Sequence, residues 1–474
     1  MLQDTISAVS SPRGKGGVAV IRISGSNALQ IADRMFRPFG PLPLQATPRK
    51  ARLGILLAPT ASIDWSPVDQ GLALYFPSPA SFTGEDVIEF HCHGGALLTE
   101  TLLGTTFAAG ARPATAGEFT RRAFLNGKLK LHQAEALGLM LEAETEEQLL
   151  LASSGLRENS PLTKALNALY DDLVLLLSTA YARIDYPDED LADLSPEEVL
   201  TSLQKISTAL SALLKSFRTG HAVVEGIQTT ICGRPNVGKS SIYNRLIGEN
   251  KAIVTDIPGT TRDILEHTAQ CGEVLLRLSD TAGIRDLQSA DPVEQIGIEK
   301  ARQKLADAEL ILAVFDGSEA LTDADTALIA SLKATLTDNP RAYLLFVLNK
   351  SDKPAAVSPE QLNQAFGKAV PCVAVSAQSG EGWSNLVSLI QKTFLEGHLD
   401  LSQNAIIMNA RQNACLVSAL EAVRRAEKSL SLGFTFDIVS SDLEEALESI
   451  RQVDGRSVNE DIVSSIFAHF CVGK

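Results

Sequence analysis

Residues 233–240 read Gly233-Arg234-Pro235-Asn236-Val237-Gly238-Lys239-Ser240 and fit the phosphate-loop pattern G-x-x-x-x-G-K-[ST]. A short β-branched run, Ile227–Cys232, precedes the loop, and an amphipathic run, Ser241–Ile247, follows it. A strand, a glycine-rich loop and a helix in this order aim backbone N–H groups and the positive end of a helix at a phosphate. In this pattern Lys239 reaches the β- and γ-phosphates, and the Ser240 hydroxyl binds Mg²⁺.

A chance glycine-rich turn could match the same pattern, so companion motifs decide the interpretation. Asp280-Thr281-Ala282-Gly283 follows a strand candidate that begins at Val274. An aspartate there holds Mg²⁺ through water, and the glycine amide senses the γ-phosphate. The segment Thr255-Asp256-Ile257-Pro258-Gly259-Thr260-Thr261-Arg262-Asp263 reads as a switch, with Thr261 placed to reach Mg²⁺ when a γ-phosphate is present.

Two further motifs predict the choice of base. In Asn349-Lys350-Ser351-Asp352, the carboxylate of Asp352 offers two acceptor oxygens to the N1–H and N2–H₂ edge of guanine, and adenine has no such donor pair. Ser376-Ala377-Gln378 is expected to contact the guanine base on the side opposite Asp352. The phosphate loop, the switch segment, Asp280–Gly283 and Asn349–Asp352 occur in this order along the chain, so the sequence predicts a GTPase.

One position departs from the arrangement of Ras-type GTPases. Ile284 follows Gly283, where Ras-like enzymes carry the glutamine that orients the attacking water. An isoleucine has no group that orients water. We therefore expect either slow hydrolysis or another residue in this role.

Composition limits the class of protein. The 474 residues are 45% hydrophobic and 21% charged, which is ordinary for a folded soluble protein, and allow two to four domains. We find no apolar run long enough to span a membrane, no secretory signal and no C-x-x-C pair among the six cysteines, so we expect a cytoplasmic protein without a membrane partner. The net charge of −15 disfavours broad nucleic-acid binding, so an RNA partner would need a local basic patch or a second, more basic protein.

The predicted fold class combines α/β and α+β parts. Residues 1–126 mix strands and a few helices, which predicts an α+β domain. Residues 222–393 carry near-continuous apolar strands between helices, which predicts a doubly wound parallel sheet. Residues 127–221 and 394–474 are helical, so the nucleotide domain is inserted between two halves of one helical bundle.

Local signals set two helix boundaries within the bundle. The apolar spacing of Leu129–Ser154 predicts one helix that stops at Gly155. Ser195 is the expected N-cap of another, with Pro196 in its first turn. The final Cys471-Val472-Gly473-Lys474 imitates a prenylation box, but its last residue and the lack of a preceding basic run exclude lipidation.

Polar residues in the first domain are open to two interpretations. Arg22 lies within an apolar strand, and period two puts Glu89 on the same strand face as Val87 and His91. Composition alone favours a solvated strand face. His91 and His93 share a face, but two ligands without a third predict a structural role or a pocket lining rather than a metal site.

The whole chain resembles the MnmE (TrmE) family of tRNA modification GTPases. The resemblance rests on Ser81-Phe82-Thr83-Gly84-Glu85-Asp86 with His93-Gly94-Gly95, Gly117-Glu118-Phe119 with Arg122-Ala123-Phe124-Leu125-Asn126, Gly259-Thr260-Thr261-Arg262-Asp263, Glu294-Gln295-Ile296-Gly297-Ile298, and the closing Cys471-x-Gly-Lys. It implies an N-terminal α+β domain that binds tetrahydrofolate and dimerises, a helical domain, and an inserted Ras-like G domain.

The resemblance also implies an activity and its partners. The family, together with the flavoprotein MnmG in a heterotetramer, adds an aminomethyl-type (carboxymethylaminomethyl) group at C5 of the wobble uridine, U34, of certain tRNAs. The implied cofactors are Mg²⁺, K⁺ and 5-formyltetrahydrofolate or a related reduced folate, with GTP as substrate. Hydrolysis is implied to need K⁺-dependent dimerisation of the G domains of a homodimer.

Site residues carry over position by position. The implied GTP contacts are Asn236, Val237, Gly238, Lys239, Ser240, Ser241, Thr255, Asp256, Ile257, Pro258, Gly259, Thr260, Thr261, Asp280, Thr281, Ala282, Gly283, Asn349, Lys350, Ser351, Asp352, Ser376, Ala377 and Gln378. The implied metal ligands are Ser240 and Thr261 for Mg²⁺, and Asn236, Thr255, Ile257 and Thr260 for K⁺. Glu294 is the implied catalytic residue that positions water, which would answer the question that Ile284 raises.

The folate contacts implied by the resemblance are Arg22, Glu89, Lys128 and Lys474. Since Lys474 is the last residue, the C-terminal helices must fold back onto the first domain, and we expect them to do so across a dimer. Two other functions stay open: a regulatory or ribosome-assembly GTPase that acts only as a switch, and a folate-dependent one-carbon transferase that GTP regulates. A simple switch needs neither the first 126 residues nor the terminal Cys-x-Gly-Lys.

Overall fold

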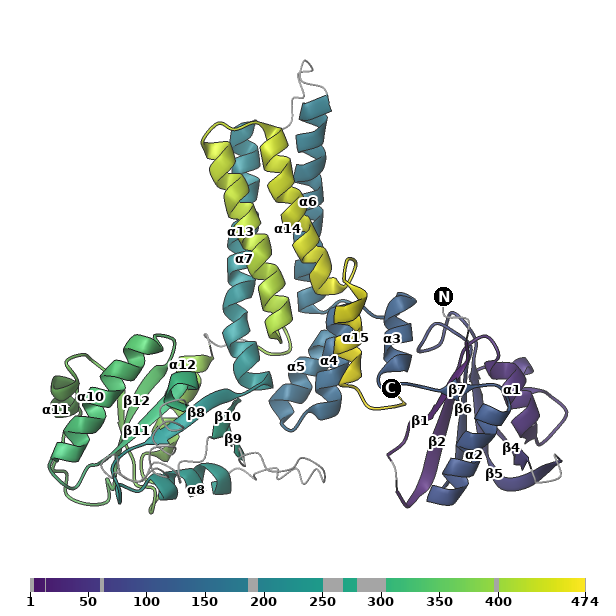
Figure 1. The fold of residues 1–474 in the computed structure, drawn as a ribbon, viewed down its shortest axis with the longest axis horizontal. Coiled ribbons are helices and arrows are strands. Elements are labelled where there is room, and N and C mark those ends of the chain that lie inside the picture. The colour runs from purple at the N-terminus through teal and green to yellow at the C-terminus, as the bar shows by residue number, and fades with distance from the viewer. Residues whose placement is uncertain are drawn as a thin grey trace, which may run out of the picture. The chain divides into compact units, whose positions relative to one another are not determined.

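The computed structural model describes residues 4–12, 14–59, 64–185, 195–249, 267–278, 304–395 and 400–473 (Figure 1). Of the residues named above, Thr255–Asp263, Asp280–Ile284, Glu294–Ile298 and Lys474 lie outside these ranges. The chain divides into two compact units, one made of residues 1–138 and 444–474 and the other of residues 139–443. The first unit thus joins the N-terminal domain to the end of the chain.

The first unit contains a seven-stranded sheet in the order β3-β4-β5-β6-β2-β1-β7. Its strands are β1 (Ile6–Val9), β2 (Gly16–Ser24), β3 (Phe36–Pro38), β4 (Arg52–Pro59), β5 (Trp65–Phe76), β6 (Val87–Gly94) and β7 (Arg112–Pro113). All neighbours are antiparallel except β1 and β7, which are parallel. The register places Arg22 of β2 directly opposite Glu89 of β6.

Helices cover one face of this sheet. The helices of this part are α1 (Ala28–Met35) and α2 (Ala96–Ala108), with a 3-10 turn at Leu44–Ala46. Ile21, Ile23, Ile88 and Phe90 point to this face and form one buried cluster with residues of both helices. Because successive strand residues face opposite sides, Arg22 and Glu89 lie on the other face.

The first unit also contains α3 (Glu118–Leu125) and α15 (Glu460–Ala468). Two helices, α4 (Leu131–Glu142) and α14 (Phe436–Asp454), begin in one unit and end in the other. Leu131 and Ala134 of α4 pack with Val463 and Phe467 of α15, and Phe124 of α3 joins this cluster. The end of the chain is therefore packed on the segment that follows the N-terminal sheet.

The second unit contains α5 (Glu146–Leu156), α6 (Pro161–Asp185), α7 (Pro196–Val224) and α13 (Ala410–Ser431). The capping box of Ser195 and Glu198, with Pro196 in the first turn, confirms the predicted start of α7. The prediction of one helix over Leu129–Ser154 is wrong. A second capping box, Thr145 with Gln148, starts α5 anew, and Gly155 lies buried inside that helix instead of ending it.

The G domain of the second unit has a six-stranded sheet in the order β13-β12-β11-β8-β10-β9. Its strands are β8 (Ile227–Cys232), β9 (His267–Cys271), β10 (Val274–Leu278), β11 (Leu310–Asp316), β12 (Tyr343–Asn349) and β13 (Cys372–Ala374). Only the β9–β10 pair is antiparallel. The helices are α8 (Lys239–Glu249), α10 (Asp323–Asp338), α11 (Pro359–Phe366) and α12 (Trp383–Phe394).

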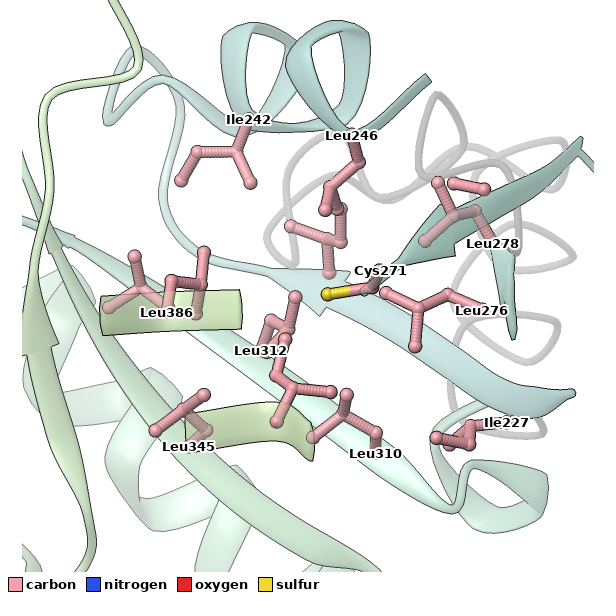
Figure 2. Packing of buried hydrophobic residues seen from close by; sticks show 14 of the residues in the cluster. Ile227, Ile242, Leu246, Cys271, Leu276, Leu278, Leu310, Leu312, Leu345 and Leu386 are labelled. Carbon is pink, nitrogen blue, oxygen red and sulfur yellow. The ribbon is translucent and has the colours of Figure 1, made fainter. Parts of the chain in front are cut away.

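Both faces of this sheet are buried, which explains its apolar strands. Leu310 and Leu312 of β11 face one cluster, which includes Ile242 and Leu246 of α8 (Figure 2). Ile311 and Phe315 face a second cluster with residues of α10 and α11. A strand covered on both sides has no solvent face for polar residues. The predicted doubly wound sheet is therefore confirmed, as is the mixed fold class.

No helix in the described ranges is both long and apolar enough to cross a membrane.

Candidate functional site

The phosphate loop joins β8 to α8 with a backbone that its residue types permit. Gly238 has φ +98°, and Asn236 also adopts the left-handed region, at φ +66°. A Cβ on Gly238 would lie 2.1 Å from Nδ2 of Asn349. Gly238 is therefore needed for conformation and for this close approach. Asn236 and Ser240 are exposed at the loop, where a phosphate and its metal ion would lie.

The side chain of Lys239 folds back onto the phosphate loop. Its Nζ donates to the carbonyl oxygens of Gly233 and Arg234, both at 2.9 Å. Burial lowers the pKa of Lys239, since desolvation penalises its charged form. The described residues hold this ammonium with neutral carbonyls only, so its positive charge is available to phosphate oxygens.

Asn349 ties the phosphate loop to the predicted base-binding loop. Its Nδ2 donates to the carbonyl oxygen of Val237 at 2.8 Å, and its Oδ1 accepts from the Ala377 amide at 3.0 Å. The side chain is 3% exposed. Both ends of this buried amide are thus satisfied, and Asn349, in one predicted GTP-binding segment, fixes two others, 236–241 and 376–378. The sequence did not indicate this second role of Asn349.

The predicted guanine ligand, Asp352, is exposed beside the same loop. A hydrogen bond from the Ser376 hydroxyl lowers the pKa of Asp352, so the carboxylate is ionised at neutral pH. Lys350 has φ +67°, and its Nζ lies 2.5 Å from Oδ2 of Asp316 at the end of β11. Burial opposes ionisation of Asp316, but this contact still holds its pKa below the usual value. Lys350 thereby anchors the loop that presents Asp352.

Among the described residues, the structure brings together the predicted contacts in 236–241, 349–352 and 376–378. The remaining predicted contacts, Thr255–Thr261 and Asp280–Gly283, and the predicted catalytic Glu294 lie outside the described residues. Their roles stay predictions.

The N-terminal candidate site centres on Arg22 and Glu89. Nε and Nη2 of Arg22 lie 2.9 and 2.8 Å from the same oxygen, Oε1 of Glu89. The Arg22 guanidinium also lies 5.8 Å from the ring centre of Phe82 and 5.7 Å from that of Phe119. Composition favoured a strand face that is simply exposed to solvent. The structure instead has an Arg22–Glu89 ion pair there, with two aromatic rings near the guanidinium.

The last described residues of the chain reach this site. The carbonyl oxygen of Gly473 accepts from Oγ of Ser10 at 2.9 Å and from Nη1 of Arg22 at 3.4 Å. Val472 forms a bridge with Ala116. We expected the tail to arrive across a dimer, and this is corrected: the tail folds back within one chain, because α15 is already packed on the segment after the sheet. Lys474 follows Gly473 directly but is not described.

Lys128 lies next to the Ser81–Asp86 loop. The would-be Cβ of Gly84 lies 3.4 Å from Cγ of Lys128, and Asn126 donates to the carbonyl oxygen of Thr83 at 2.7 Å. Phe82 of the same loop faces Arg22. The predicted folate residues Arg22 and Glu89 are therefore in contact, while Lys128 lies beside the Ser81–Asp86 loop, whose Phe82 contacts Arg22.

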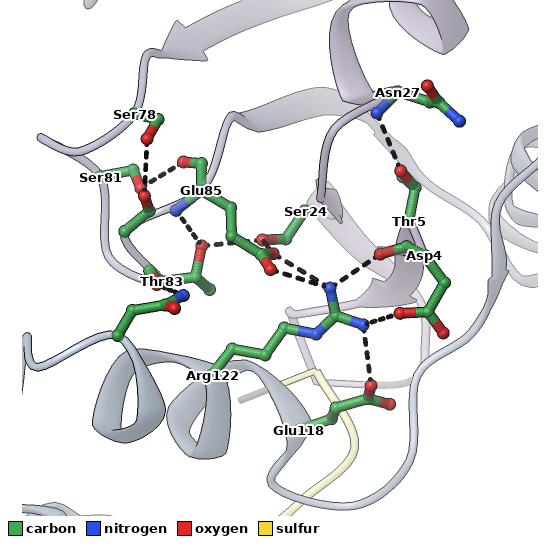
Figure 3. A network of polar contacts seen from close by, with 12 residues as sticks. Asp4, Thr5, Ser24, Asn27, Ser78, Ser81, Thr83, Glu85, Glu118 and Arg122 are labelled. Carbon is green, nitrogen blue, oxygen red and sulfur yellow. Dashed lines mark hydrogen bonds and ion pairs between the residues drawn. The ribbon is translucent and has the colours of Figure 1, made fainter. Parts of the chain in front are cut away.

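A buried arginine holds the motifs of this domain together (Figure 3). The Arg122 side chain is 1% exposed, and its guanidinium contacts Asp4, Glu85 and Glu118 at 2.8–3.1 Å. Arg112 pairs with the same Glu118 at 2.6 Å. Burial alone would raise the pKa of Glu118, but Arg112 and further donors lower it to about 2. Glu85, Glu118 and Arg122, which belong to the motifs shared with the family, therefore hold this domain together.

The two histidines make separate contacts. Nδ1 of His93 lies 2.7 Å from Oδ1 of Asp69, and Nε2 of His91 lies 3.5 Å from Oε2 of Glu89. Within the described ranges, no cluster of three potential metal ligands exists. These contacts agree with the structural interpretation.

A charged junction joins α7 to the G domain. Nδ1 of His221 lies 3.3 Å from Glu225, and Nε2 lies 3.0 Å from Glu309, which also accepts from the Gln228 amide. The hydrogen bonds to Glu225 and Glu309 raise the pKa of His221 to about 9. Arg218 lies 5.0 Å from the ring centre of Phe394, at the other end of the insertion. The sequence did not indicate this contact.

Comparisons with known proteins cover the whole chain. The family model for the MnmE helical domain matches residues 131–471, and the model for the GTP-binding protein TrmE N-terminus matches residues 5–128. A curated relative from Heliobacterium modesticaldum is 39% identical over 480 residues, and one from Symbiobacterium thermophilum is 38% identical over 481 residues. Each alignment covers 100% of both chains, and both relatives are called tRNA modification GTPase MnmE.

A solved structure of Era from Aquifex aeolicus, bound to GDP and AlF4⁻, covers 41% of this chain and 65% of that chain at 25% identity. Its TM-score is 0.28, and at so low a score the likeness adds nothing to the assignment. The family models and full-length relatives are sufficient: the chain belongs to the MnmE family of tRNA modification GTPases.

Proposed function

We propose that this chain hydrolyses GTP as part of the modification of tRNA at C5 of the wobble uridine, together with a flavoprotein of the MnmG type. One observation favours this function over that of a simple GTPase switch. The carbonyl oxygen of Gly473 is bonded to Ser10 and Arg22, so the end of the chain is built into the N-terminal domain beside an ion pair. A switch has no need of such a site, whereas a modification enzyme needs a second ligand besides GTP.

The G domain supplies the nucleotide site. Asp352 accepts from the guanine edge, and Asn349 holds the base loop and the phosphate loop at a fixed spacing. The ammonium of Lys239 and the amides at the start of α8 bind phosphate oxygens. The phosphate loop and the base-binding loop are thus held in place before the nucleotide binds, so little binding energy is spent on ordering them.

The two metal ions fit the described part of this site. The exposed hydroxyl of Ser240 would hold Mg²⁺, which supplies charge neutralisation on the phosphates. The exposed side chain of Asn236 would hold K⁺, together with backbone oxygens of Thr255, Ile257 and Thr260. Asn236 adopts the left-handed backbone region, which asparagine tolerates better than most residues.

We assign the positioning of the attacking water to Glu294, since Ile284 has no polar group. Replacement of Glu294 by alanine should lower turnover by about 10²–10⁴-fold and leave GTP binding intact. Turnover at the parent rate would exclude this assignment. Hydrolysis is proposed to need two G domains of a homodimer.

The N-terminal site fits a reduced folate. Glu89 would accept from the donor edge of the pterin, and Arg22 or Lys128 would pair with its carbonyl or carboxylate groups. The ring of Phe82, 39% exposed next to Arg22, offers a surface on which a pterin could stack. Lys474 would complete the site, because its neighbour Gly473 is bonded to Arg22. The bound folate would supply the one-carbon unit.

The test is nucleoside analysis of tRNA by mass spectrometry. A strain that lacks this gene is expected to lose the C5 modification of the wobble uridine, and the full chain should restore it. A chain with Glu89 replaced by alanine should restore GTP hydrolysis but not the modification. If wobble nucleosides are the same with and without the gene, the switch function is the correct one.

A further inference from the structure

The half-buried Arg245 lies on the helix that begins in the phosphate loop. Helix α8 starts at Lys239, and Arg245 follows about 1.7 turns later in the same helix. Ile242 and Leu246 of this helix point into the buried core of the G domain (Figure 2). Because α8 is packed on the core in this way, Arg245 has a fixed position relative to the phosphate loop.

The guanidinium of Arg245 binds the middle residue of the predicted base-binding segment 376–378. Its Nη1 donates to the carbonyl oxygen of Ala377 at 3.0 Å. The amide of the same residue donates to Oδ1 of Asn349, also at 3.0 Å. Both backbone groups of Ala377 are therefore bonded to side chains from other segments. Asn349 ties the segment to the phosphate loop directly, and Arg245 ties it to the helix that extends that loop.

Two further contacts hold this guanidinium in place. Its Cζ lies 5.4 Å from the ring centre of Trp383, the first residue of α12, which is buried. Gly380 lies so close to it that a Cβ there would be 2.3 Å from Nη2 of Arg245. Gly380 also closes the turn of the base-binding segment, since its amide donates to the carbonyl oxygen of Ser376 at 2.8 Å. A guanidinium can pack on an aromatic ring and still donate a directed hydrogen bond.

We propose that Arg245 is a positioning residue for guanine nucleotide binding, which holds segment 376–378 where it contacts the base. Arg245 acts through Ala377 and not by touching the nucleotide, and this role rests on the nucleotide site proposed above. A hydrogen bond from a charged donor is stronger than one between neutral groups, so it favours one position of the segment in the empty protein. A segment that is ordered before the nucleotide binds costs less binding free energy.

A purely structural role of Arg245 would have different consequences. If Arg245 only packed α8 against Trp383, its loss would lower the fraction of folded protein. Turnover per total protein would then fall, while the molecules that remain folded would keep their affinity for GTP. A loosened base-binding segment instead leaves the phosphate loop intact and weakens nucleotide binding. The Michaelis constant and the turnover number therefore separate the two roles.

The experiment uses the full chain in KCl and compares the parent with Arg245→Met and Arg245→Lys. Methionine keeps an apolar side chain beside Trp383 but has no donor for Ala377, whereas lysine keeps a charged donor. The matched control is Arg341→Met, at an exposed position between α10 and β12, outside the predicted nucleotide contacts. Steady-state hydrolysis gives KM and kcat for GTP, and isothermal titration gives the Kd of GDP.

Arg245→Met should raise the KM for GTP and the Kd of GDP by about fivefold or more, as expected when one charge-assisted hydrogen bond is lost. Its kcat at saturating GTP should stay within about twofold of the parent value, because the γ-phosphate contacts are unchanged. Arg245→Lys should bind GDP more tightly than Arg245→Met, and Arg341→Met should match the parent in all three constants.

Three results would overturn the positioning role: parent-like KM and Kd in Arg245→Met, a fall in kcat at unchanged KM, or equal losses in Arg341→Met. If the parent binds and hydrolyses GTP, each of these results refutes only the role of Arg245 and leaves the proposed function standing. A parent protein that neither binds nor hydrolyses GTP would refute the proposed nucleotide site and, with it, the role of Arg245.

Discussion

The carbonyl oxygen of Gly473 lies 2.9 Å from the hydroxyl of Ser10, 463 residues earlier in the chain. The same oxygen accepts from Arg22, whose guanidinium holds Glu89. Segments near the beginning and the end of the chain, at Ser10 and Gly473, therefore meet beside the residues proposed to bind folate. This contact makes Gly473 part of the proposed site.

The tail should be required for folate binding but not for hydrolysis. Gly473→Ala should disrupt its docking, because Gly473 has φ +102° and a Cβ would lie 2.3 Å from the carbonyl oxygen of Val9. We expect this variant, and a chain truncated after Phe470, to lose reduced-folate binding by about tenfold or more while the GTPase rate is unchanged. Equilibrium dialysis with 5-formyltetrahydrofolate measures this. Cys471→Ser is the control, and unchanged binding by the truncated chain would refute the role of the tail.

Base choice should depend on one carboxylate. Asp352→Asn should weaken GTP binding by about 1–3 kcal/mol, because a charged acceptor for the guanine edge is lost. Isothermal titration of GTP into the variant and the parent measures the difference. Glu360→Gln, which changes another exposed carboxylate of the same domain, should bind GTP like the parent. An unchanged affinity of the Asp352 variant would contradict the prediction.

Turnover should depend on the alkali cation. A cage of backbone oxygens completed by the Asn236 side chain favours K⁺ over Na⁺ by size and ligand number. We expect GTP turnover in KCl to exceed that in NaCl at matched ionic strength, and Asn236→Ala to abolish the difference. Equal rates of the parent protein in the two salts would remove the argument for a K⁺ site.

The N-terminal domain should depend on Arg122 for stability. Arg122→Ala leaves Asp4, Glu85 and Glu118 without their shared partner and should lower the free energy of unfolding by about 3–5 kcal/mol. Arg121→Ala is the matched control, because Arg121 pairs with Glu460, which is 83% exposed, and should cost less than about 1 kcal/mol. Urea unfolding followed by circular dichroism compares the two, and equal losses would contradict the buried role.

The junction between α7 and the G domain should weaken in alkali. The pKa of His221 is raised to about 9, so its stabilising contribution is complete below the ordinary value of about 6.5 and disappears as the pH rises through about 9. Glu225 and Glu309 face the imidazole, and Arg277 and Arg218 lie near those two carboxylates.

The measurement for this junction is the thermal midpoint by calorimetry from about pH 7 to about pH 10, for the parent and for His221→Gln. The parent should be more stable by about 1–3 kcal/mol at the lower pH, and the difference should vanish at the upper pH. A difference that does not change with pH would show that His221 contributes without its charge.

Local patterns were enough to predict the G domain. The phosphate loop and the Asn349–Asp352 motif bind nucleotide through residues close together in the chain, and strands buried on both faces read as apolar runs. Ser195, Pro196 and Glu198 fixed the start of α7, since a capping box is a contact between residues three apart. By the same logic, Thr145 and Gln148 could have revealed the break between α4 and α5, but the apolar spacing across it was misread as one helix.

The tertiary structure alone decided which distant residues meet. Arg22 and Glu89 are paired because the β2–β6 register sets them opposite each other, and Asn349 binds two loops because β12 lies beside β11, next to β8. The docking of Gly473 within its own chain follows from the packing of α15. Each of these contacts joins residues far apart in the sequence, where composition and periodicity carry no information on distance; only the burial of shared apolar faces brings such residues together.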